Sequence, residues 1–271
     1  MEKYVLCIPN GGFNDQLSQM ELCYTYCKKF NRTLLIETKN SVYNKSFHEY
    51  FSFHNPEIKI ICNSDEIKKI TKNRKLRFNK GNNRNDYGRS FLTFSSFSGY
   101  DQDFSKEKDF KEDILVHQGC GKGYPRILLK LLRFDEKILS KFKERYEKIE
   151  KPYLCLYIRN TDRQSDFKKL YQENKDLIDS YKSIYVATDN KDVLNYFKKE
   201  GLKFHNFTTF GKSTAPLHSD RRLDNDIKII DMICDMLLVG LSEKMLTNSG
   251  GGFTRLCSHL HENKDWIHEK I

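Results

Sequence analysis

Hydrophobic and polar positions follow two periods along the first half of the chain. A short apolar run at residues 4–9 is typical of a buried strand, and the apolar positions after it have helical spacing over residues 15–30. Further short strands are predicted at residues 33–37, 58–62 and 114–117, and an amphipathic helix at residues 134–149. Strand and helix signals therefore alternate from the start of the sequence.

The second half of the chain alternates more regularly. The pattern predicts strands at residues 153–158, 183–187, 203–206 and 244–247, and helices at residues 166–181, 190–200, 223–241 and 253–261. The helix over residues 223–241 is the clearest, because its apolar positions recur at intervals of three and four residues. Alternating strands and helices predict parallel sheets covered by helices, so the expected fold class is α/β.

A charge-rich predicted helix ends at Lys151 and Pro152, and a proline in this position indicates a domain boundary. The chain has 271 residues, which is enough for two modest domains. We expect an N-terminal domain over residues 1–150 and a C-terminal domain over residues 151–271. Residues 68–110 are rich in Asn, Lys, Arg, Phe and Ser and are weakly periodic, so they are predicted to form an irregular insertion in the first domain.

Four loops follow predicted strands, at residues 10–16, 158–165, 187–190 and 247–253. Ligands of parallel α/β sheets bind beyond the carboxyl ends of the strands, so we expect these loops to face one cleft. The first and last of them contain glycine runs, which let backbone N–H groups approach an anion at the start of a helix. For residues 247–253 we favour ligand contact, whereas a tight turn explains residues 10–16 equally well. Neither loop matches the common nucleotide-hydrolase or dinucleotide motifs.

Charged residues beside these loops suggest chemistry but do not decide it alone. Arg159 directly follows a predicted strand, where an arginine can hold a phosphate through two parallel hydrogen bonds, although a surface ion pair explains it equally well. Asp231 and Asp235 are four residues apart on one predicted helix, so both carboxylates project from the same face. A solvated helix edge is the ordinary interpretation of that spacing. His259 and His261 point to different helix faces, so no metal site is expected there.

The net charge of +10 is concentrated in one segment. Residues 68–89 contain nine Lys and Arg residues and a single acidic one, Asp86, so the rest of the chain is close to neutral. A general nucleic-acid-binding surface is therefore not expected. A solvated loop explains the segment, and the alternative is a loop that faces an acidic glycan, a lipid-linked acceptor or an anionic membrane.

The eight cysteines contain no C-x-x-C pair and lie mostly in apolar strand or helix patterns. Disulfide scaffolds and zinc sites are poorly supported by this spacing, so we expect free buried thiols and a reducing, cytoplasmic location. The N-terminal apolar run is shorter than a secretory signal requires. No stretch approaches the roughly 18 apolar residues that span a membrane, so we expect contact with a membrane to be peripheral.

Several motifs together resemble the fucosyltransferase superfamily. Residues 11–16, with the sequence GGFNDQ, and residues 31–36, with the sequence NRTLLI, are similar to the opening of protein O-fucosyltransferases and α-1,2-fucosyltransferases. Residues 157–163 (YIRNTDR) and 184–190 (IYVATDN) resemble motifs of the α-1,6-fucosyltransferase and nodulation-type branch. The helix that carries Asp235 and the later residues 247–253 are similar to a third motif of that branch.

This resemblance implies a GT-B fold, in which two Rossmann-like α/β domains face a central cleft. It also implies an inverting transfer of fucose from GDP-fucose to a hydroxyl of a glycan, a lipid-linked glycan or a peptide, with no cofactor and no obligatory metal. Two alternatives stay open at this point. One is a transferase for another GDP-sugar, of the mannose or heptose type, and the other is a non-catalytic homologue that binds a nucleotide-sugar or a nucleic acid.

The resemblance also assigns roles to individual residues. Arg159 would hold the β-phosphate and neutralise the leaving GDP, Ser249 would donate to the phosphates, and Asp235 would accept from the guanine edge. The remaining donor-site residues that it implies are Gly11, Gly12, Asn14, Tyr157, Asp162, Arg163, Asp189, Gly250, Gly251, Gly252 and Phe253. The family's His stands at Tyr157, its second Arg at Asn160, and the Asn of its glycine loop at Asp15. A carboxylate beside phosphates is unfavourable, so Asp15 is instead the candidate general base.

Overall fold

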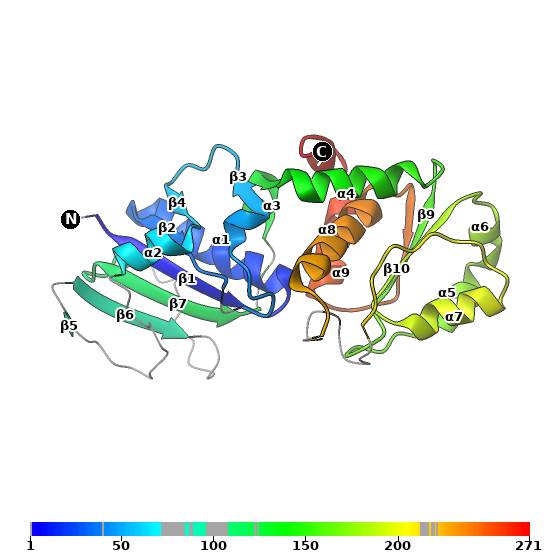
Figure 1. Cartoon of the computed structure of the whole chain (residues 1–271), viewed down its shortest axis with the longest axis horizontal. Coiled ribbons are helices and arrows are strands. Elements are labelled where there is room, and N and C mark those ends of the chain that lie inside the picture. Colours follow the sequence, from blue (N-terminus) through cyan, green and yellow to red (C-terminus); the bar gives the residue numbers. More distant parts are fainter. Residues whose placement is uncertain are drawn as a thin grey trace. The chain divides into compact units, whose positions relative to one another are not determined.

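The computed structural model describes most of the chain in two compact units, Met1–Arg133 and Phe134–Ile271 (Figure 1). The described residues are 2–39, 41–71, 85–86, 89–95, 108–121, 123, 125–211, 217, 220 and 222–271, with the backbone alone for 85–86, 89–95 and 120. Each unit contains a mainly parallel sheet with helices packed against it, which is the α/β class that the alternating pattern predicts.

The first unit is built on a six-stranded sheet in the order β4-β2-β1-β7-β6-β5. The strands are β1 (Tyr4–Asn10), β2 (Thr33–Ile36), β4 (Ile60–Ile61), β5 (Asn85–Asp86), β6 (Arg89–Ser95) and β7 (Ile114–Cys120). All neighbours pair in parallel except β5 and β6. The central strand β1 is buried along its apolar positions, which explains why it reads as an unbroken hydrophobic run.

Short helices and a small second sheet complete this unit. The helices are α1 (Phe13–Phe30), α2 (Ser64–Ile70) and α3 (Arg126–Leu131), with a 3₁₀ turn at Phe47–Glu49. Strands β3 (Phe51–Phe53) and β8 (Leu132–Phe134) form a two-stranded sheet. Helix α1 ends at Asn31, whose left-handed backbone (φ 50°, ψ 52°) is a conformation that asparagine tolerates better than most residues.

Part of the predicted irregular insertion is a strand of the main sheet. Strand β6 pairs in parallel with β7, with Phe91 opposite Ile114 and Ser95 opposite Gln118. The prediction of irregular structure over residues 68–110 is therefore wrong for this strand. The sequence signal is weak because serine and arginine flank a short apolar run, whereas buried parallel strands usually read as longer ones. Residues 72–84, 87 and 88 of the predicted basic segment lie outside the described residues.

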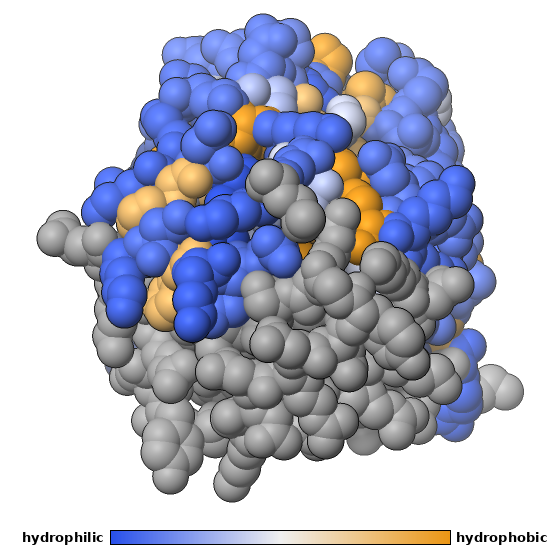
Figure 2. All heavy atoms as spheres, turned by 90° about the vertical axis from the view of Figure 1, so that its left-hand side faces the viewer, coloured by the Kyte–Doolittle hydropathy of each residue, from blue (hydrophilic) through white to orange (hydrophobic). Residues whose placement is uncertain are grey.

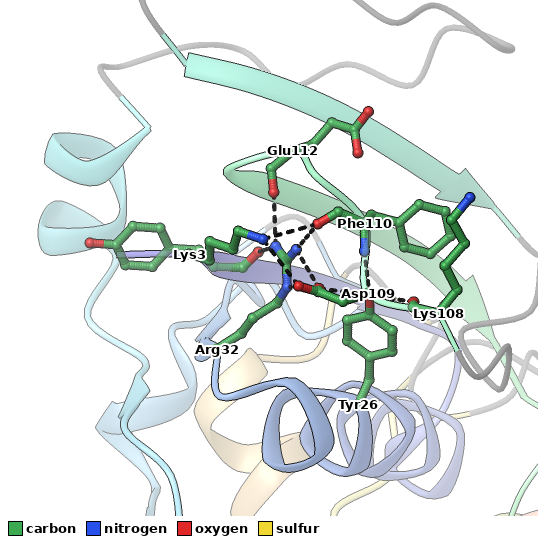
Figure 3. A network of polar contacts seen from close by, with 8 residues as sticks. Lys3, Tyr26, Arg32, Lys108, Asp109, Phe110 and Glu112 are labelled. Atoms are coloured by element: carbon green, nitrogen blue, oxygen red, sulfur yellow. Dashed lines mark hydrogen bonds and ion pairs between the residues drawn. The ribbon is translucent and has the colours of Figure 1, made fainter. Parts of the chain in front are cut away.

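A polar network anchors the chain where it enters β7 (Figure 3). Arg32, directly after α1, has a fully buried side chain that donates to one oxygen of Asp109 from Nε at 3.0 Å and Nη2 at 2.7 Å. Its Nη1 donates to the carbonyl of Glu112 at 2.9 Å. Lys3 donates to the other oxygen of Asp109 at 3.0 Å, and the Tyr26 hydroxyl donates to the carbonyl of Lys108 at 3.1 Å. The network thus joins α1, β1 and the segment before β7.

The second unit contains a three-stranded parallel sheet in the order β10-β9-β11. Its strands are β9 (Leu154–Ile158), β10 (Ile184–Thr188) and β11 (Lys244–Leu246). Its helices are α4 (Glu136–Glu147), α5 (Phe167–Glu173), α6 (Lys175–Asp179), α7 (Lys191–Lys199), α8 (Asn225–Leu241), α9 (Gly252–Glu262) and α10 (Asp265–His268). Strands β9 and β10 are buried throughout, which matches their continuous apolar sequences.

The contacts within the chain divide it after Arg133, whereas the sequence predicted a boundary after residue 150. Helix α4 packs against α8 and therefore belongs to the second unit. Ile138 and Phe142 on α4 are buried, and the Cys234 thiol on α8 donates to the carbonyl of Ile138 at 3.9 Å. Pro152 marks the end of a helical pattern, but the apolar face of that helix decides which core it joins.

Two predicted elements of the second unit differ from the structure. The single helix expected over residues 166–181 is divided into α5 and α6 at Asn174, whose side chain donates to the carbonyl of Leu170 at 2.8 Å. The strand expected at residues 203–206 is reduced to one parallel bridge between Tyr185 and His205. There the Asn206 side chain donates to the carbonyl of Val186 at 2.8 Å and takes the place of further backbone pairing.

The surface and the thiols agree with the expectations from composition where they are described. Figure 2 shows a face of the first unit on which the described residues are mostly hydrophilic, with hydrophobic ones in small groups. Seven cysteines are described as free thiols, as expected, and all except Cys62 are buried. Burial raises the pKa of Cys62 and of Cys234 to about 12, so both stay protonated near neutral pH. No described helix has the length and apolar character to span a membrane.

Candidate functional site

Three loops at the carboxyl ends of β9, β10 and β11 meet in the second unit. The backbone N–H of Arg159 donates to the Ser249 hydroxyl at 2.9 Å, which joins the loops after β9 and β11. Asp189 after β10 accepts from the backbone N–H of Asn160 at 2.7 Å and from the Thr161 hydroxyl at 2.6 Å. The predicted convergence of loops is confirmed for these three, and Asp189 serves to fix the loop after β9. The fourth loop, residues 10–16, belongs to the first unit.

The glycine run after β11 forms the start of helix α9. Gly251 caps this helix with φ 128° and ψ 170°, a backbone conformation open almost only to glycine. No side chain caps the helix. A Cβ atom on Gly251 would lie 3.4 Å from Nη1 of Arg159 and 3.6 Å from Cδ of Arg163, so both arginines lie directly against this backbone. A helix start whose N–H groups donate to no side-chain cap, with two arginines beside it, is suited to binding an anion.

Asp162 holds the guanidinium of Arg159 in one orientation. Arg159 donates to the two carboxylate oxygens of Asp162 from Nε at 2.9 Å and from Nη2 at 2.7 Å. The third nitrogen, Nη1, is the one nearest to Gly251. The ion pair that the sequence left as an alternative is therefore present, and it directs the remaining nitrogen of Arg159 toward the glycine run.

Ser249 and Tyr157 both contact the elements around this loop. Because the Ser249 hydroxyl accepts the Arg159 N–H, its own proton is available to a further acceptor. Tyr157 is buried, its ring lies 6.4 Å from the ring of Phe253, and it is hydrogen-bonded to Thr254 on α9. Burial raises the pKa of Tyr157, so it is a neutral phenol where the family has a histidine. Tyr157 therefore contributes packing and not charge.

Asp235 on α8 lies in a second polar cluster, beside β10. The Tyr185 hydroxyl donates to Oδ1 at 2.5 Å and the Thr208 hydroxyl to Oδ2 at 2.9 Å. Burial raises the pKa of Asp235 to about 6, although the hydrogen bonds from Tyr185 and Thr208 and the charge of Arg145 oppose the shift. Each carboxylate oxygen accepts one hydrogen bond here and retains capacity for another. The ring of Phe207 is stacked against Tyr185 at 6.0 Å.

Asp231, one turn before Asp235, does not lie on a solvated helix edge, so that interpretation is wrong for it. Its carboxylate is buried and forms an ion pair with Arg145 on α4. Its second oxygen accepts the backbone N–H of Thr209 at 2.7 Å. Sequence reasoning missed Arg145, Tyr185, Phe207 and Thr208 as neighbours of this helix. Of these four, only Arg145 carries a sequence signal: it is a charged residue within the pattern of an amphipathic helix, and the structure buries it.

The glycine loop of the first unit is organised around the start of α1. Asp15 accepts the backbone N–H of Gly12 at 3.3 Å, which is the one half of a capping box that a glycine N-cap allows, and Gln16 donates to the carbonyl of Gly11 at 3.0 Å. Gly11 has φ 86°, so it needs the conformational freedom of glycine. Asn14 is buried, and its Oδ1 has no hydrogen-bond partner among the residues that the structure describes. These contacts show that Gly11 and Gly12 form the turn that leads into α1.

Histidine, cysteine and acidic side chains do not gather into a metal site within the described residues, where no group of three or more is placed to hold an ion. His259 and His261 are both on α9, and burial lowers the pKa of each. The ring of His259 lies edge-on to Trp266 at 5.0 Å, and His261 lies 3.4 Å from the Ser242 hydroxyl. Both histidines therefore pack within the second unit.

Comparison with known proteins shows similarity only at the level of structure. No protein-family model matches the chain, and no curated protein matches its sequence. The fucosyltransferase NodZ from Bradyrhizobium is similar with a TM-score of 0.65 and 16% identity, over 96% of this chain and 92% of that chain. NodZ α-1,6-fucosyltransferase co-crystallized with GDP matches equally well over 96% and 93% of the two chains.

A second group of solved structures has the same arrangement. POFUT1 in complex with GDP is similar with a TM-score of 0.58 and 14% identity, over 99% of this chain and 97% of that chain. POFUT1 in complex with GDP-fucose has a TM-score of 0.56 at 14% identity, over 96% and 94%. At this level of identity the likeness concerns the fold, and it extends over nearly the whole chain. The chain thus has the GT-B-like α/β fold of the fucosyltransferases NodZ and POFUT1, as its sequence motifs implied.

Proposed function

We propose that the chain is a glycosyltransferase that moves fucose from GDP-fucose to a hydroxyl of a glycan or peptide. The observation that carries this proposal is the placement of Arg159 and Arg163 against Gly251, at the uncapped start of α9 and beside the Ser249 hydroxyl. The fold shared with NodZ and POFUT1, whose solved structures contain GDP or GDP-fucose, supports the choice of donor.

The proposed donor chemistry matches these groups. The acceptor oxygen attacks C1 of the fucosyl group, the bond from C1 to the β-phosphate oxygen breaks, and GDP leaves with the electron pair. Negative charge then increases on the β-phosphate, where the Nη1 group of Arg159, the Ser249 proton and the N–H groups at the start of α9 would stabilise it. Groups fixed in advance in this way need no rearrangement during the reaction. Asp162 supplies that fixation for Arg159.

The proton of the acceptor hydroxyl must pass to a base, and we propose Asp15 for this role. One oxygen of its carboxylate caps α1, and the other lies 3.7 Å from the position of a Cβ atom on Gly121. The carboxylate is half-buried and stands at the carboxyl end of β1 and β7. An Asp15→Asn variant that turns over at the full rate would contradict this part of the proposal.

Asp235 is the residue that we propose to select guanine over other bases. A carboxylate can accept together from the ring N–H and the amino group of guanine, which lie side by side, whereas uracil offers only one such donor. The hydrogen bonds from Tyr185 and Thr208 hold the two oxygens of Asp235 in place. Gly250 directly precedes the N-cap residue of α9, and Gly252 and Phe253 are the first residues of that helix, so their proposed contacts are with the diphosphate.

The alternatives differ in donor sugar or in turnover. The second arginine of the family motif is replaced by Asn160, whose side chain accepts the backbone N–H of Ser165 at 3.2 Å and so belongs to the loop itself. A single arginine of that motif is consistent with weaker diphosphate binding or with another GDP-sugar. The test is a thermal-shift screen with GDP, UDP and ADP, followed by measurement of GDP release from GDP-fucose and GDP-mannose with glycan and peptide acceptors.

We expect GDP to stabilise the protein selectively and GDP-fucose to release GDP fastest. Faster release from GDP-mannose would favour the second donor, and binding without release would favour a non-catalytic homologue. The absence of any shift with guanine nucleotides would contradict the whole proposal. We also propose that the reaction needs no metal, so activity should survive an excess of EDTA. Cytoplasmic location remains part of the proposal, supported by the seven free thiols among the described cysteines.

A further inference from the structure

A buried ion pair joins α4 and α8 in the second unit. Arg145 donates from Nη2 to Oδ1 of Asp231, and the two side chains are only 6% and 8% exposed. Removing two charges from water costs several kcal/mol, so a buried pair adds little net stability compared with apolar residues of similar size. Its presence next to the Asp235 cluster therefore calls for another explanation.

The ion pair holds the chain on both sides of Thr208. The guanidinium carbon of Arg145 lies 5.8 Å from the ring centroid of Phe207, a cation–π contact, and Oδ2 of Asp231 accepts the backbone N–H of Thr209 at 2.7 Å. Thr208 lies between these two anchored residues, and its hydroxyl donates to Oδ2 of Asp235 at 2.9 Å. Three consecutive residues thus connect the ion pair to Asp235.

The other contacts of this segment are made mostly by side chains, because its regular pairing with the sheet is a single bridge at His205. Asn206 donates its side-chain N–H groups to the carbonyl of Val186 and, at 3.3 Å, to the Thr208 hydroxyl, and the ring of Phe207 is stacked on Tyr185. A chain segment without a continuous ladder of backbone hydrogen bonds depends on its side-chain anchors for its position. The position of the Thr208 hydroxyl therefore depends on Asp231 and Arg145, which hold the two neighbouring residues, together with the side chain of Asn206.

We propose that Arg145 and Asp231 are positioning residues for recognition of the nucleotide base: they hold Thr208 so that Asp235 presents its carboxylate in one orientation. This inference rests on the proposed function, and it deepens it by naming what sets the preference for guanine. Neither residue touches the base. They act through Phe207 and Thr209, so loss of the packing on Phe207 or of the acceptor for the Thr209 N–H should weaken the binding of guanine nucleotides and leave phosphate binding at Arg159 intact.

Two matched double variants of the full chain test this. Arg145→Met with Asp231→Asn removes both charges but keeps an oxygen that accepts the Thr209 N–H, whereas Arg145→Met with Asp231→Leu removes that acceptor as well. Methionine retains an apolar contact with Phe207 in both. Glu144→Gln, an exposed change on the same helix, is the control. Isothermal titration gives the Kd for GDP and for UDP, and thermal unfolding shows whether each variant is folded.

We expect the Asn double variant and the control to bind GDP within about threefold of the wild type. The Leu double variant should bind GDP about tenfold more weakly, the effect of losing one hydrogen bond, with the Kd for UDP unchanged. Equal GDP affinity in the two double variants, or a parallel loss of GDP and UDP, would overturn the inference. Failure of the wild-type protein to bind GDP would instead contradict the proposed function itself, and the inference with it.

Thr208→Val tests the same link without altering the ion pair, in case the Leu double variant does not fold. Valine has the shape of threonine and cannot donate to Asp235. We expect a several-fold weaker affinity for GDP and no change for UDP. A folded Thr208→Val protein that binds GDP like the wild type would overturn the inference, because the connection from the ion pair to Asp235 runs through this hydroxyl.

Discussion

At the scale of single residues, the side chains of the candidate site use some of their hydrogen-bonding groups to contact the protein and leave others for a ligand. Arg159 uses two nitrogens for Asp162 and directs the third toward Gly251. Ser249 accepts from the backbone and keeps its proton, and Asp235 accepts two hydroxyls while retaining further capacity. Each group is thus fixed before a ligand arrives, which is the condition for strong electrostatic stabilisation of a transition state.

We expect Arg159→Ala to reduce kcat for fucose transfer by about 10²–10³-fold, the usual effect of removing one fixed donor from a developing negative charge. The thermal unfolding temperature should change little, because the ion pair that the variant breaks is open to solvent at its Asp162 end, where the side chain is 40% exposed. Initial rates of GDP release and circular dichroism check both points. Lys175→Ala, which removes an exposed side chain on α6 of the same unit, is a suitable control. A folded Arg159→Ala protein with near-normal kcat would contradict the assignment.

The raised pKa of Asp235 leads us to expect that GDP binding depends on pH. Its pKa of about 6 means that the carboxylate is protonated as the pH falls through this value, and a protonated carboxyl accepts from guanine less well. We expect the Kd for GDP to rise steadily below pH 6 and to be nearly constant above pH 7, with little such change for UDP. Titration calorimetry between pH 5 and 8 measures this. A flat GDP profile would show that Asp235 does not read the base.

The ionised form of Asp235 favours GDP binding but lowers the stability of the folded protein, so the two properties should depend on pH in opposite directions. Because burial raises the pKa above its value of 3.8, the folded state binds this proton more tightly than the unfolded state does. The group therefore contributes stability below pH 4 that is lost as the pH rises through 6. We expect Asp235→Asn to raise the unfolding temperature at pH 8 relative to the wild type, but not at pH 4, while weakening GDP binding. A lowered unfolding temperature at pH 8 would contradict this sign.

At the scale of elements, the Arg32 network decides how α1, β1 and β7 fit together (Figure 3). The buried guanidinium satisfies a carboxylate and backbone carbonyls before β7 at the same time, through N–H groups that point in different directions. The pKa of Asp109 is lowered because the hydrogen bonds from Arg32 and Lys3 outweigh the effect of burial, which acts to raise it. The contribution of this carboxylate to stability is therefore present at neutral pH and lost as the pH falls below its ordinary value.

We expect Arg32→Met to destabilise the protein by about 3–5 kcal/mol, since it leaves buried acceptors without a donor. Arg32→Lys should lose less, because an ammonium keeps the charge but reaches fewer acceptors. Urea unfolding monitored by far-UV circular dichroism measures the difference in the free energy of unfolding. Lys28→Met, which breaks an exposed pair with Glu57, is the control and should cost under about 1 kcal/mol. An Arg32→Met protein as stable as that control would contradict this account of the network.

At the scale of the whole molecule, the division of the chain after Arg133 has a consequence for folding. Helix α4 contributes Ile138 and Phe142 to the core of the second unit, and Arg145 to the buried pair with Asp231. A fragment of residues 134–271 should therefore unfold cooperatively, whereas a fragment of residues 151–271 should not, because it exposes the apolar face of α8 and leaves Asp231 without its partner. Thermal unfolding of the two purified fragments checks this. Equal cooperativity would place the boundary at Pro152.

Several features followed from the sequence because they depend on local physics. Hydrophobic period gave β1, α1, β9, β10 and α8, and glycines after strands marked the loops that meet beside Arg159. Strand β6 and the short bridge at His205 could not be placed in this way, because their pairing is decided by distant partners and not by their own composition.

The sequence by itself determined the α/β class, the order of most elements and the loops that carry Arg159 and Ser249, since periodicity and glycine positions report local geometry. Only the tertiary structure decided the division of roles between Asp231 and Asp235. Their spacing on α8 is compatible with two equivalent side chains, but Arg145 packs against one and Tyr185 and Thr208 against the other. Contacts between residues far apart in the chain set the partners and the orientation of each carboxylate, and no pattern within one helix encodes them.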